Sequence, residues 1–295
     1  MPPIVRTVLG DIAPATLGPT DAHDHAFFAS PLLAGQELDD LGRAIEEVRT
    51  LAAAGASAFV DWTPLGLGRD VDGLRAVSEG VGVHIVASTG VHREAHYAPD
   101  HPLRRRSADE LAEVFAADVA SGSGAIKIGA DYHRLSPFER TVFEAAVTAH
   151  RRTGAPVLVH TELGTHGAEI VELLDGVESP VLAHLDRNPD ASEHAELAAA
   201  GAYLEYDGPG RTKYWPDSTI LRLIADVAER GHADRLLCGG DLAGRHMSRA
   251  YGGGPGMDYL FARFKPRLER ELGAELSQTI FVDNPARAFA FEPRS

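Results

Sequence analysis

The sequence predicts a (β/α)8 TIM barrel, and three observations lead to this fold class. Short apolar, β-branched segments recur along the chain, each ends in polar or small residues, and helical patterns lie between them. Near-continuous apolar runs of this length are typical of strands buried on both faces of a parallel sheet. Eight such segments alternating with helices over about 250 residues match the size of a barrel.

The strands are assigned from the apolar segments. In chain order they cover residues 19–25, 57–63, 83–89, 125–131, 156–162, 181–187, 202–207 and 235–241. The chain contains no linker, low-complexity tract or repeat that would divide it, so we expect a single barrel domain over residues 1–295. An open doubly wound sheet would need a Gly-rich phosphate turn after its first strand, where this chain has DAHDHAFF at residues 21–28.

Helix start and stop signals support the segments between the strands. Ser107 is followed three residues later by Glu110, which is the spacing of a capping box. Other segments open with Ser-Pro or end at a glycine, as helices commonly do. The four clearest helical patterns cover residues 39–55, 107–122, 136–154 and 217–231.

Composition excludes several classes of partner. The formal net charge of −15 is opposite to that of proteins that neutralise nucleic-acid phosphates. The single cysteine, Cys238, rules out an intrachain disulfide framework. We see no secretory signal and no apolar run of about 18 residues, so we expect a cytoplasmic protein without a membrane partner.

Six polar side chains fall at the carboxyl ends of the predicted strands, where barrels of this class carry their chemistry. They are His23, His25, Lys127, His160, His184 and Asp241. His23 and His25 point to the same side of their strand, roughly 6.5 to 7 Å apart. An isolated histidine is usually a structural residue, but four of them with an aspartate at strand ends predict a divalent metal site.

Lys127 stands out because the chain has only two other lysines, Lys213 and Lys265, and because isoleucines flank it on a strand. A buried ammonium group is costly unless it is paired or loses its proton. Two interpretations remain open. Lys127 could form a salt bridge with Asp131 or Asp241, or its pKa could fall until the free amine adds carbon dioxide and the carbamate bridges two metals.

Taken together, these residues resemble the phosphotriesterase family of the amidohydrolase superfamily. The resemblance rests on the H-x-H pair, the strand lysine, the two single histidines and the final aspartate. It also includes VASTG at 86–90, HTELGTH at 160–166 and IFVDNPARAFAF at 280–291. The resemblance extends over essentially the whole chain.

The resemblance implies a binuclear metal centre. His23, His25 and Asp241 would hold the more buried ion, and His160 and His184 the more exposed one. A carboxylated Lys127 and a hydroxide would bridge two divalent ions, zinc first, with manganese, cobalt or iron as alternatives. The hydroxide would attack the substrate while Asp241 moves the proton to the leaving group. Asp186 would either orient His184 from behind or serve as a salt-bridge or helix-cap residue.

The family contains several activities, and two loops favour one of them. Residues 206–217 and 241–260 resemble those of the subgroup that opens phosphorylated sugar lactones. Lys213 and Arg245 would clamp the anionic group of a small substrate, and Tyr97 would add a phosphate contact. The alternative for the two cations is that they are solvated or pair with nearby acidic residues.

Other functions are also considered. Val91-His92 stands where many lactonases of the family place a tyrosine, which argues against long acyl-homoserine lactones. The alternatives are a phosphotriesterase or carboxylesterase of the same family, or a catalytically inactive metal-binding barrel. We also expect a homodimer.

Overall fold

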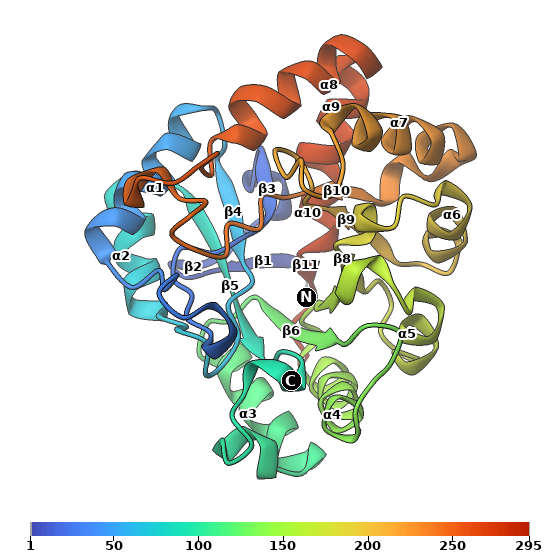
Figure 1. The fold of residues 1–295 in the computed structure, drawn as a ribbon. Coiled ribbons are helices and arrows are strands. Elements are labelled where there is room, and N and C mark those ends of the chain that lie inside the picture. The colour runs from blue at the N-terminus through green and yellow to red at the C-terminus, as the bar shows by residue number, and fades with distance from the viewer. Residues whose placement is uncertain (1, 295) are drawn as a thin grey trace.

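The computed structural model describes residues 2–294, and within them the predicted barrel is confirmed. Eight parallel strands pair in sequence order, and helices surround them (Figure 1). The barrel strands are β3 (Thr20–Asp24), β4 (Ala58–Asp61), β5 (His84–Gly90), β6 (Ala125–Ala130), β7 (Val157–Thr161), β8 (Val181–Ala183), β9 (Tyr203–Tyr206) and β10 (Leu236–Cys238).

The barrel closes through the chain that follows β10. The backbone amides of Gly240 and Asp241 donate to the carbonyl oxygen of His23 at 2.9 and 2.8 Å. These two bonds connect the last strand segment to the first and place Asp241 beside His23.

The helices that cover the barrel are α1 (Leu41–Ala53), α2 (Val71–Val81), α3 (Ala108–Ala120), α4 (Pro137–Thr153), α5 (Gly167–Leu173), α6 (Ala191–Ala199), α7 (Asp217–Val227), α8 (Lys265–Leu272), α9 (Ala274–Gln278) and α10 (Asn284–Ala288). The capping box predicted at Ser107 and Glu110 is present at the start of α3. A second capping box, from Ser136 and Glu139, begins α4.

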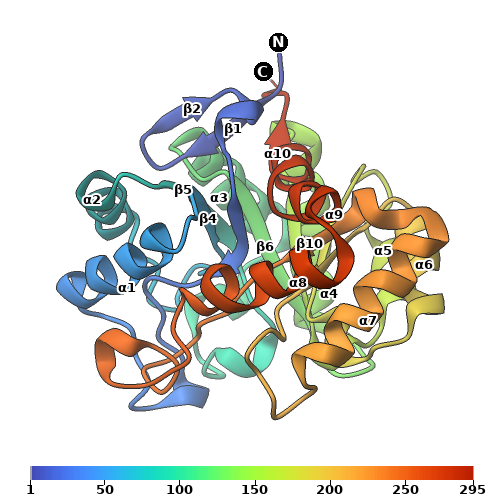
Figure 2. The same cartoon turned by 90° about the horizontal axis from the view of Figure 1, so that it is seen from above.

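A small antiparallel sheet lies at one end of the barrel and was not predicted from the sequence. It consists of β1 (Ile4–Thr7), β2 (Gly10–Ile12) and β11 (Ala290–Phe291). Figure 2 shows this sheet at the end where both termini lie, away from the long loops of the opposite end. The carboxyl ends of the barrel strands therefore face an end left free for a site.

Two predicted strands end well before their expected carboxyl ends. The segment 181–187 leaves the sheet after Ala183, because His184 has the left-handed φ of 66° and a 3-10 turn follows it. The segment 235–241 leaves after Cys238, so Asp241 lies in the loop beyond β10. None of the helices described for residues 2–294 combines the length and apolar character needed to cross a bilayer.

Candidate metal centre

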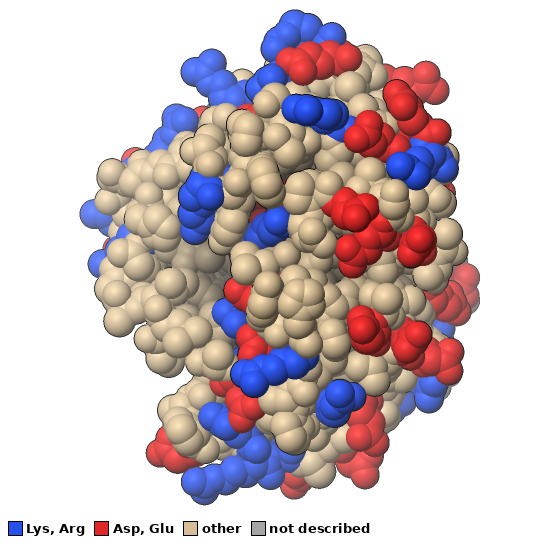
Figure 3. All heavy atoms as spheres, turned by 45° about the vertical axis from the view of Figure 1, so that its right-hand side comes forward, with Lys and Arg blue, Asp and Glu red and all other residues tan. Residues whose placement is uncertain are grey.

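A cavity of about 210 Å³ opens at the carboxyl ends of the barrel strands. Figure 3 shows the hollow on this side of the molecule, with Lys and Arg side chains beside it. All six side chains expected at the site line this cavity: His23, His25, Lys127, His160, His184 and Asp241. Segments that are far apart in sequence therefore meet here, as the carboxyl ends of barrel strands do.

His23, His25 and Asp241 form one potential ligand group. The Nε2 atoms of both histidines lie 3.5 Å from Oδ1 of Asp241. The three side chains can each offer one ligand atom within 4.8 Å of the others, and all three residues are buried. Two imidazole nitrogens and a carboxylate oxygen are a donor set that suits a divalent transition metal.

His160 and His184 lie next to this group and form a second pair. Nδ1 of His160 is 2.7 Å from Nε2 of His184, and the rings meet edge to face. The other nitrogen of each ring is engaged by a carboxylate: Nε2 of His160 lies 2.8 Å from Glu162, and Nδ1 of His184 contacts Asp207. Nδ1 of His160 and Nε2 of His184 thus face each other at hydrogen-bonding distance.

The remaining ring nitrogens of the first group are also fixed by oxygen atoms. Nδ1 of His23 lies 3.1 Å from Glu205, a residue of β9. Nδ1 of His25 lies 2.8 Å from the hydroxyl of Thr63, which itself donates to the carbonyl of Phe27. Contacts of this kind set the tautomer and orientation of ligating histidines, and they leave Nε2 directed at the cavity.

Trp62 holds the His23 ring from one side. The two rings stack with their centroids 3.9 Å apart, and the indole nitrogen donates to the carbonyl of Ala22 at 2.7 Å. Trp62 is fully buried and directly follows β4. The His23 ring is therefore held both by packing and by its contact with Glu205.

Burial favours the neutral, metal-binding form of the His23, His160 and His184 imidazoles. It lowers the pKa of His23 and His160 well below the usual histidine value, and it also lowers the pKa of His184. Neighbouring positive groups add to the effect at His160, where His184 and Lys127 act in the same direction. A divalent ion would meet lone pairs here rather than protons.

Neighbouring positive charges, rather than burial, set the protonation state of Asp241 and keep it ionised. Burial alone would raise its pKa, but Arg211 and His23 outweigh burial and hold the pKa well below its usual range. Nη2 of Arg211 and Nη2 of Arg187 lie 2.9 and 3.0 Å from Oδ2. Oδ1 faces the histidines, so the two oxygens of this carboxylate have different partners.

Lys127 is buried at the same cavity, and burial lowers its pKa to about 7. The salt bridges considered from the sequence are absent in the part of the chain described here. Asp131 pairs with Arg93 and Arg134, and Asp241 pairs with the two arginines named above. An amine with a pKa near neutrality is partly unprotonated at physiological pH, which is the form that reacts with carbon dioxide.

Strained backbone marks two of these positions. His184 and Asp241 adopt φ values of 66° and 46°, in the left-handed region that costs non-glycine residues energy. Gly90 at the end of β5 has a φ of 105°, and a Cβ there would collide with the Lys127 carbonyl. The chain adopts these conformations where it carries site residues.

Asp186 does not contact His184. It is buried, and its Oδ1 accepts the backbone amide of Asp207 at 3.1 Å. Asp207 occupies the position behind His184, and Arg187 pairs with Asp207 rather than with Asp186. Asp186 is thus one contact further from the site than the orienting role would place it, because it lies on the turn after β8.

Tyr97 and Arg245, expected to contact the substrate, do not line the cavity, and other protein groups engage both side chains. The Tyr97 hydroxyl donates to the Leu65 carbonyl and accepts the His92 amide, so protein groups already use it. Arg245 reaches the Glu37 carbonyl at 2.6 Å and Asp39 at 2.9 Å. These contacts direct its guanidinium towards the segment before α1.

Lys213 lies at the rim. It is exposed, and its Nζ sits 4.9 Å from the ring centroid of Tyr214, a residue that does line the cavity. Arg187 contacts the same ring from 4.8 Å. The acidic partners considered for Lys213 face other groups; Asp207, for example, is fully buried against His184.

Sequence reasoning did not assign Glu205, Asp207, Thr63 and Trp62 to the site. A signal existed for the first two, because Glu205 and Asp207 stand two positions apart at the end of a predicted buried strand. Side chains two apart share a face, and a buried pair of carboxylates needs partners. Thr63 and Trp62 had no comparable signal, since both residue types are common at strand ends without any site.

Comparison with known proteins identifies the family of the chain. The family model described as "Phosphotriesterase family" matches residues 3–289. Two relatives are named phospho-furanose lactonase: one from Mycoplasmopsis synoviae is 30% identical, and one from Mycoplasmopsis agalactiae is 31% identical. Each alignment covers 98% of this chain and 92% of the relative.

A solved structure gives the same result at the level of the fold. The crystal structure of a lactonase from Listeria monocytogenes superposes with a TM-score of 0.92 at 31% identity, covering 98% of this chain and 99% of that one. The family match extends over nearly the whole chain, and the buried histidines and aspartate supply metal ligands where the family is metal-dependent. The chain therefore belongs to the phosphotriesterase family of metal-dependent hydrolases.

Proposed function

We propose that this hydrolase uses two divalent metal ions, zinc first, to open the ring of a phosphorylated sugar lactone. The observation that carries the proposal is the double set of inward-facing nitrogens around Lys127 and Asp241. One ion would be held by His23, His25 and Asp241, and the other by His160 and His184. A carboxylated Lys127 would join them.

The donor set fits such a pair of ions. Five of the six groups are imidazoles or a carboxylate, and oxygen atoms from Glu205, Asp207, Thr63 and Glu162 hold the histidine rings. Bound ions would polarise the lactone carbonyl and make a water molecule more acidic. Ligand residues fixed in this way need little rearrangement before binding.

The chain's own residues would then carry out the proton transfers. Asp241 would accept the proton of the attacking water and pass it to the alkoxide that leaves when the ring opens. Arg187 and Arg211 hold Oδ2 of Asp241, which leaves Oδ1 towards the cavity. Phe28, Leu32 and Leu33 form an apolar wall of the cavity that would limit the access of bulk water.

The substrate class rests on charge at the rim and on the named relatives. Lys213 would bind the anionic group from beside Tyr214, while Arg187 stays with its carboxylates. A cation placed away from the reacting carbonyl contributes binding energy that positions the ring. The relatives from the two Mycoplasmopsis species bear the name phospho-furanose lactonase, in line with an anionic sugar lactone.

A comparison of two substrates and three enzymes tests the proposal. The substrates are a phosphorylated five-membered sugar lactone and its dephosphorylated form, and the enzymes are wild type, Lys213→Ala and Arg245→Ala. A charge-assisted contact is worth about 1.5 to 3 kcal/mol. Lys213→Ala should therefore lose roughly 10- to 150-fold in kcat/KM on the phosphorylated lactone alone.

Arg245→Ala is the matched control, because its guanidinium is bound to Asp39 and Glu37. It should change neither substrate selectively. Equal losses on both lactones in Lys213→Ala would show that Lys213 supports its loop rather than binding the anion. Turnover of organophosphate triesters with no turnover of any lactone would replace the proposed reaction by a phosphotriesterase activity.

A further inference from the structure

His96 is a polar residue of the metal-site cavity to which the proposed function gives no role. It lies in the loop after β5, at the end of the 3-10 turn Glu94–His96, and its side chain lines the cavity of about 210 Å³. Its ring packs on His92 with the centroids 4.1 Å apart, and the ring of His92 packs on His160 at 4.6 Å. His96 is therefore two ring contacts away from a candidate metal ligand.

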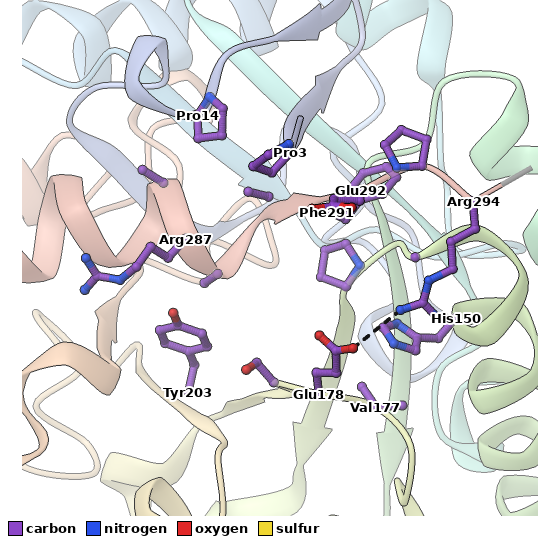
Figure 4. Close-up of a pocket in the computed structure, with 17 residues that line it drawn as sticks. Pro3, Pro14, His150, Val177, Glu178, Tyr203, Arg287, Phe291, Glu292 and Arg294 are labelled. Carbon is purple, nitrogen blue, oxygen red and sulfur yellow. Dashed lines mark ion pairs between the residues drawn. The ribbon is translucent and has the colours of Figure 1, made fainter. Parts of the chain in front are cut away.

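A larger cavity, of about 670 Å³, lies at the amino ends of β7, β8 and β9 (Figure 4). Its charged groups Glu178 and Arg294 face each other at 3.6 Å, and none of the residues assigned to the metal centre lines it. A side chain that recognises a substrate bound at the metal centre must therefore line the smaller cavity, as His96 does.

Ser30 fixes the orientation and the tautomer of the His96 ring. Nδ1 of His96 lies 2.9 Å from Oγ of Ser30, and Oγ also accepts the backbone amide of Leu32 at 3.2 Å. The hydroxyl hydrogen of the buried Ser30 needs an acceptor, and Nδ1 is the acceptor that the described residues place within its reach. The hydrogen of the neutral imidazole then sits on Nε2, which makes this atom a donor.

Nε2 of His96 is free to meet a ligand. It has no hydrogen-bond partner among residues 2–294, and protein atoms do not enclose it, whereas they do enclose the unpartnered Nδ1 of His92. Because the His96 side chain lines the cavity, its open atom is presented there. Burial lowers the pKa of His96 to about 3, and the nearby charge of Lys127 acts in the same direction, so the ring is neutral at physiological pH.

The surroundings of this donor indicate which group it would meet. A neutral N–H suits a hydroxyl oxygen, whereas a phosphate is matched better by a cation such as Lys213. In the proposed reaction the carbonyl oxygen of the lactone is directed to the metal ions. The hydroxyl next to that carbonyl, on carbon 2 of the sugar, is then the polar group closest to the metal centre and to His96.

We propose that His96 is a specificity-determining residue that recognises the hydroxyl on carbon 2 of the lactone. Its Nε2–H would donate to the hydroxyl oxygen, with Ser30 holding the ring in place. This inference rests on the proposed function and narrows its substrate class to 2-hydroxy lactones. A 2-deoxy lactone would leave the donor without its acceptor, which a site built for a hydroxyl disfavours.

Hydrolysis of two matched lactones by the metal-loaded protein tests the proposal. The substrates are a five-carbon 1,4-lactone 5-phosphate, taken as the carbon-2 epimer that wild type hydrolyses faster, and its 2-deoxy analogue. One neutral hydrogen bond should give wild type a roughly 2- to 12-fold higher kcat/KM on the hydroxylated lactone. His96→Phe keeps an aromatic ring against His92 but has no donor, so it should hydrolyse the two lactones equally. The ratio of the two values does not depend on how much of a variant folds.

Two more variants separate recognition from a structural role. His96→Gln keeps an N–H donor on a side chain of similar reach and should retain part of the preference. His84→Phe makes the same exchange as His96→Phe at the first residue of β5, away from the cavity, and should keep the wild-type ratio. Equal kcat/KM values of wild type on the two lactones, or a wild-type ratio in His96→Phe, would overturn this inference alone. Absence of hydrolysis of either lactone would refute the proposed function and this inference with it.

Discussion

Lys127 is the residue whose chemistry decides between one metal ion and two. Its amine is buried at the cavity with a pKa of about 7, and Asp131 and Asp241, the two salt-bridge partners considered from the sequence, are paired with arginines instead. We therefore expect Lys127→Ala to lose most of its bound metal, and added short carboxylates to restore part of it, because they can take the place of the carbamate. Elemental analysis of the purified variant measures this.

Lys265→Ala is the control for that experiment. Lys265 lies on α8 and pairs with Glu269, away from the cavity. It should keep the metal content of wild type. Full occupancy in Lys127→Ala would mean that no carbamate joins the ions.

The same lysine predicts a pH dependence of stability. In the unfolded chain its pKa is about 10.4, whereas in the metal-free folded protein it is about 7. Between these values the unfolded state binds the extra proton, so stability rises with pH. Relative to Lys127→Met, metal-free wild type should gain up to about 1.4 kcal/mol per pH unit from pH 7 to 9.

Urea unfolding of both proteins in carbon dioxide-free buffer at pH 6 to 9 measures that difference. Below pH 7 both states of wild type are protonated, so the difference should become constant there. Parallel curves for the two proteins over the whole range would show that the Lys127 amine is not perturbed by burial.

At the scale of elements, β9 orients two of the histidines. Glu205 contacts His23, and Asp207 contacts His184 immediately after the strand ends. Glu205→Gln and Asp207→Asn keep the shape of each side chain but replace its carboxyl group by an amide. Each should weaken metal binding by about 10- to 100-fold, as is common for groups that orient ligating histidines.

Competition with a chelator gives the metal affinity of these variants directly. Asp226→Asn, an exposed position on α7, serves as the control and should bind as wild type does. If both β9 variants keep wild-type affinity, the carboxylates only fill space behind the rings.

The elements also explain what the sequence could predict. The barrel and the gathering of polar side chains at one end follow from strands that are buried on both faces, a pattern that is local and repeated. The end of β8 could not be predicted, because the left-handed φ of His184 depends on its surroundings. The apolar pattern alone therefore predicts a single strand over residues 181–187, whereas the chain turns at His184.

The loops were harder to predict than the strands. Arg245 was expected over the cavity, yet it bonds to Asp39, 206 positions earlier in the chain. Tyr97 was expected to contact substrate, yet its hydroxyl donates a hydrogen bond to the backbone carbonyl of Leu65. Both outcomes depend on contacts between distant segments, which no local pattern encodes.

At the scale of the whole molecule, the barrel gathers candidate ligands that are separated along the chain by more than 200 residues. Closure through the His23 carbonyl brings Asp241 to His23, and the two candidate ligand groups meet in one cavity. The net charge of the chain is −15, yet arginines and a lysine line this cavity. Long-range repulsion of an anionic substrate would be offset locally by these cations.

A metal titration followed by lactone hydrolysis tests the central claim most directly. Zinc is added stepwise to the metal-free protein in the presence of bicarbonate, and the initial rate of ring opening of a phosphorylated sugar lactone is recorded at each step. We predict that the rate reaches its maximum at about two equivalents per chain, because both ligand groups must be filled. Full activity at one equivalent, or no hydrolysis at any metal content, would contradict a binuclear lactonase.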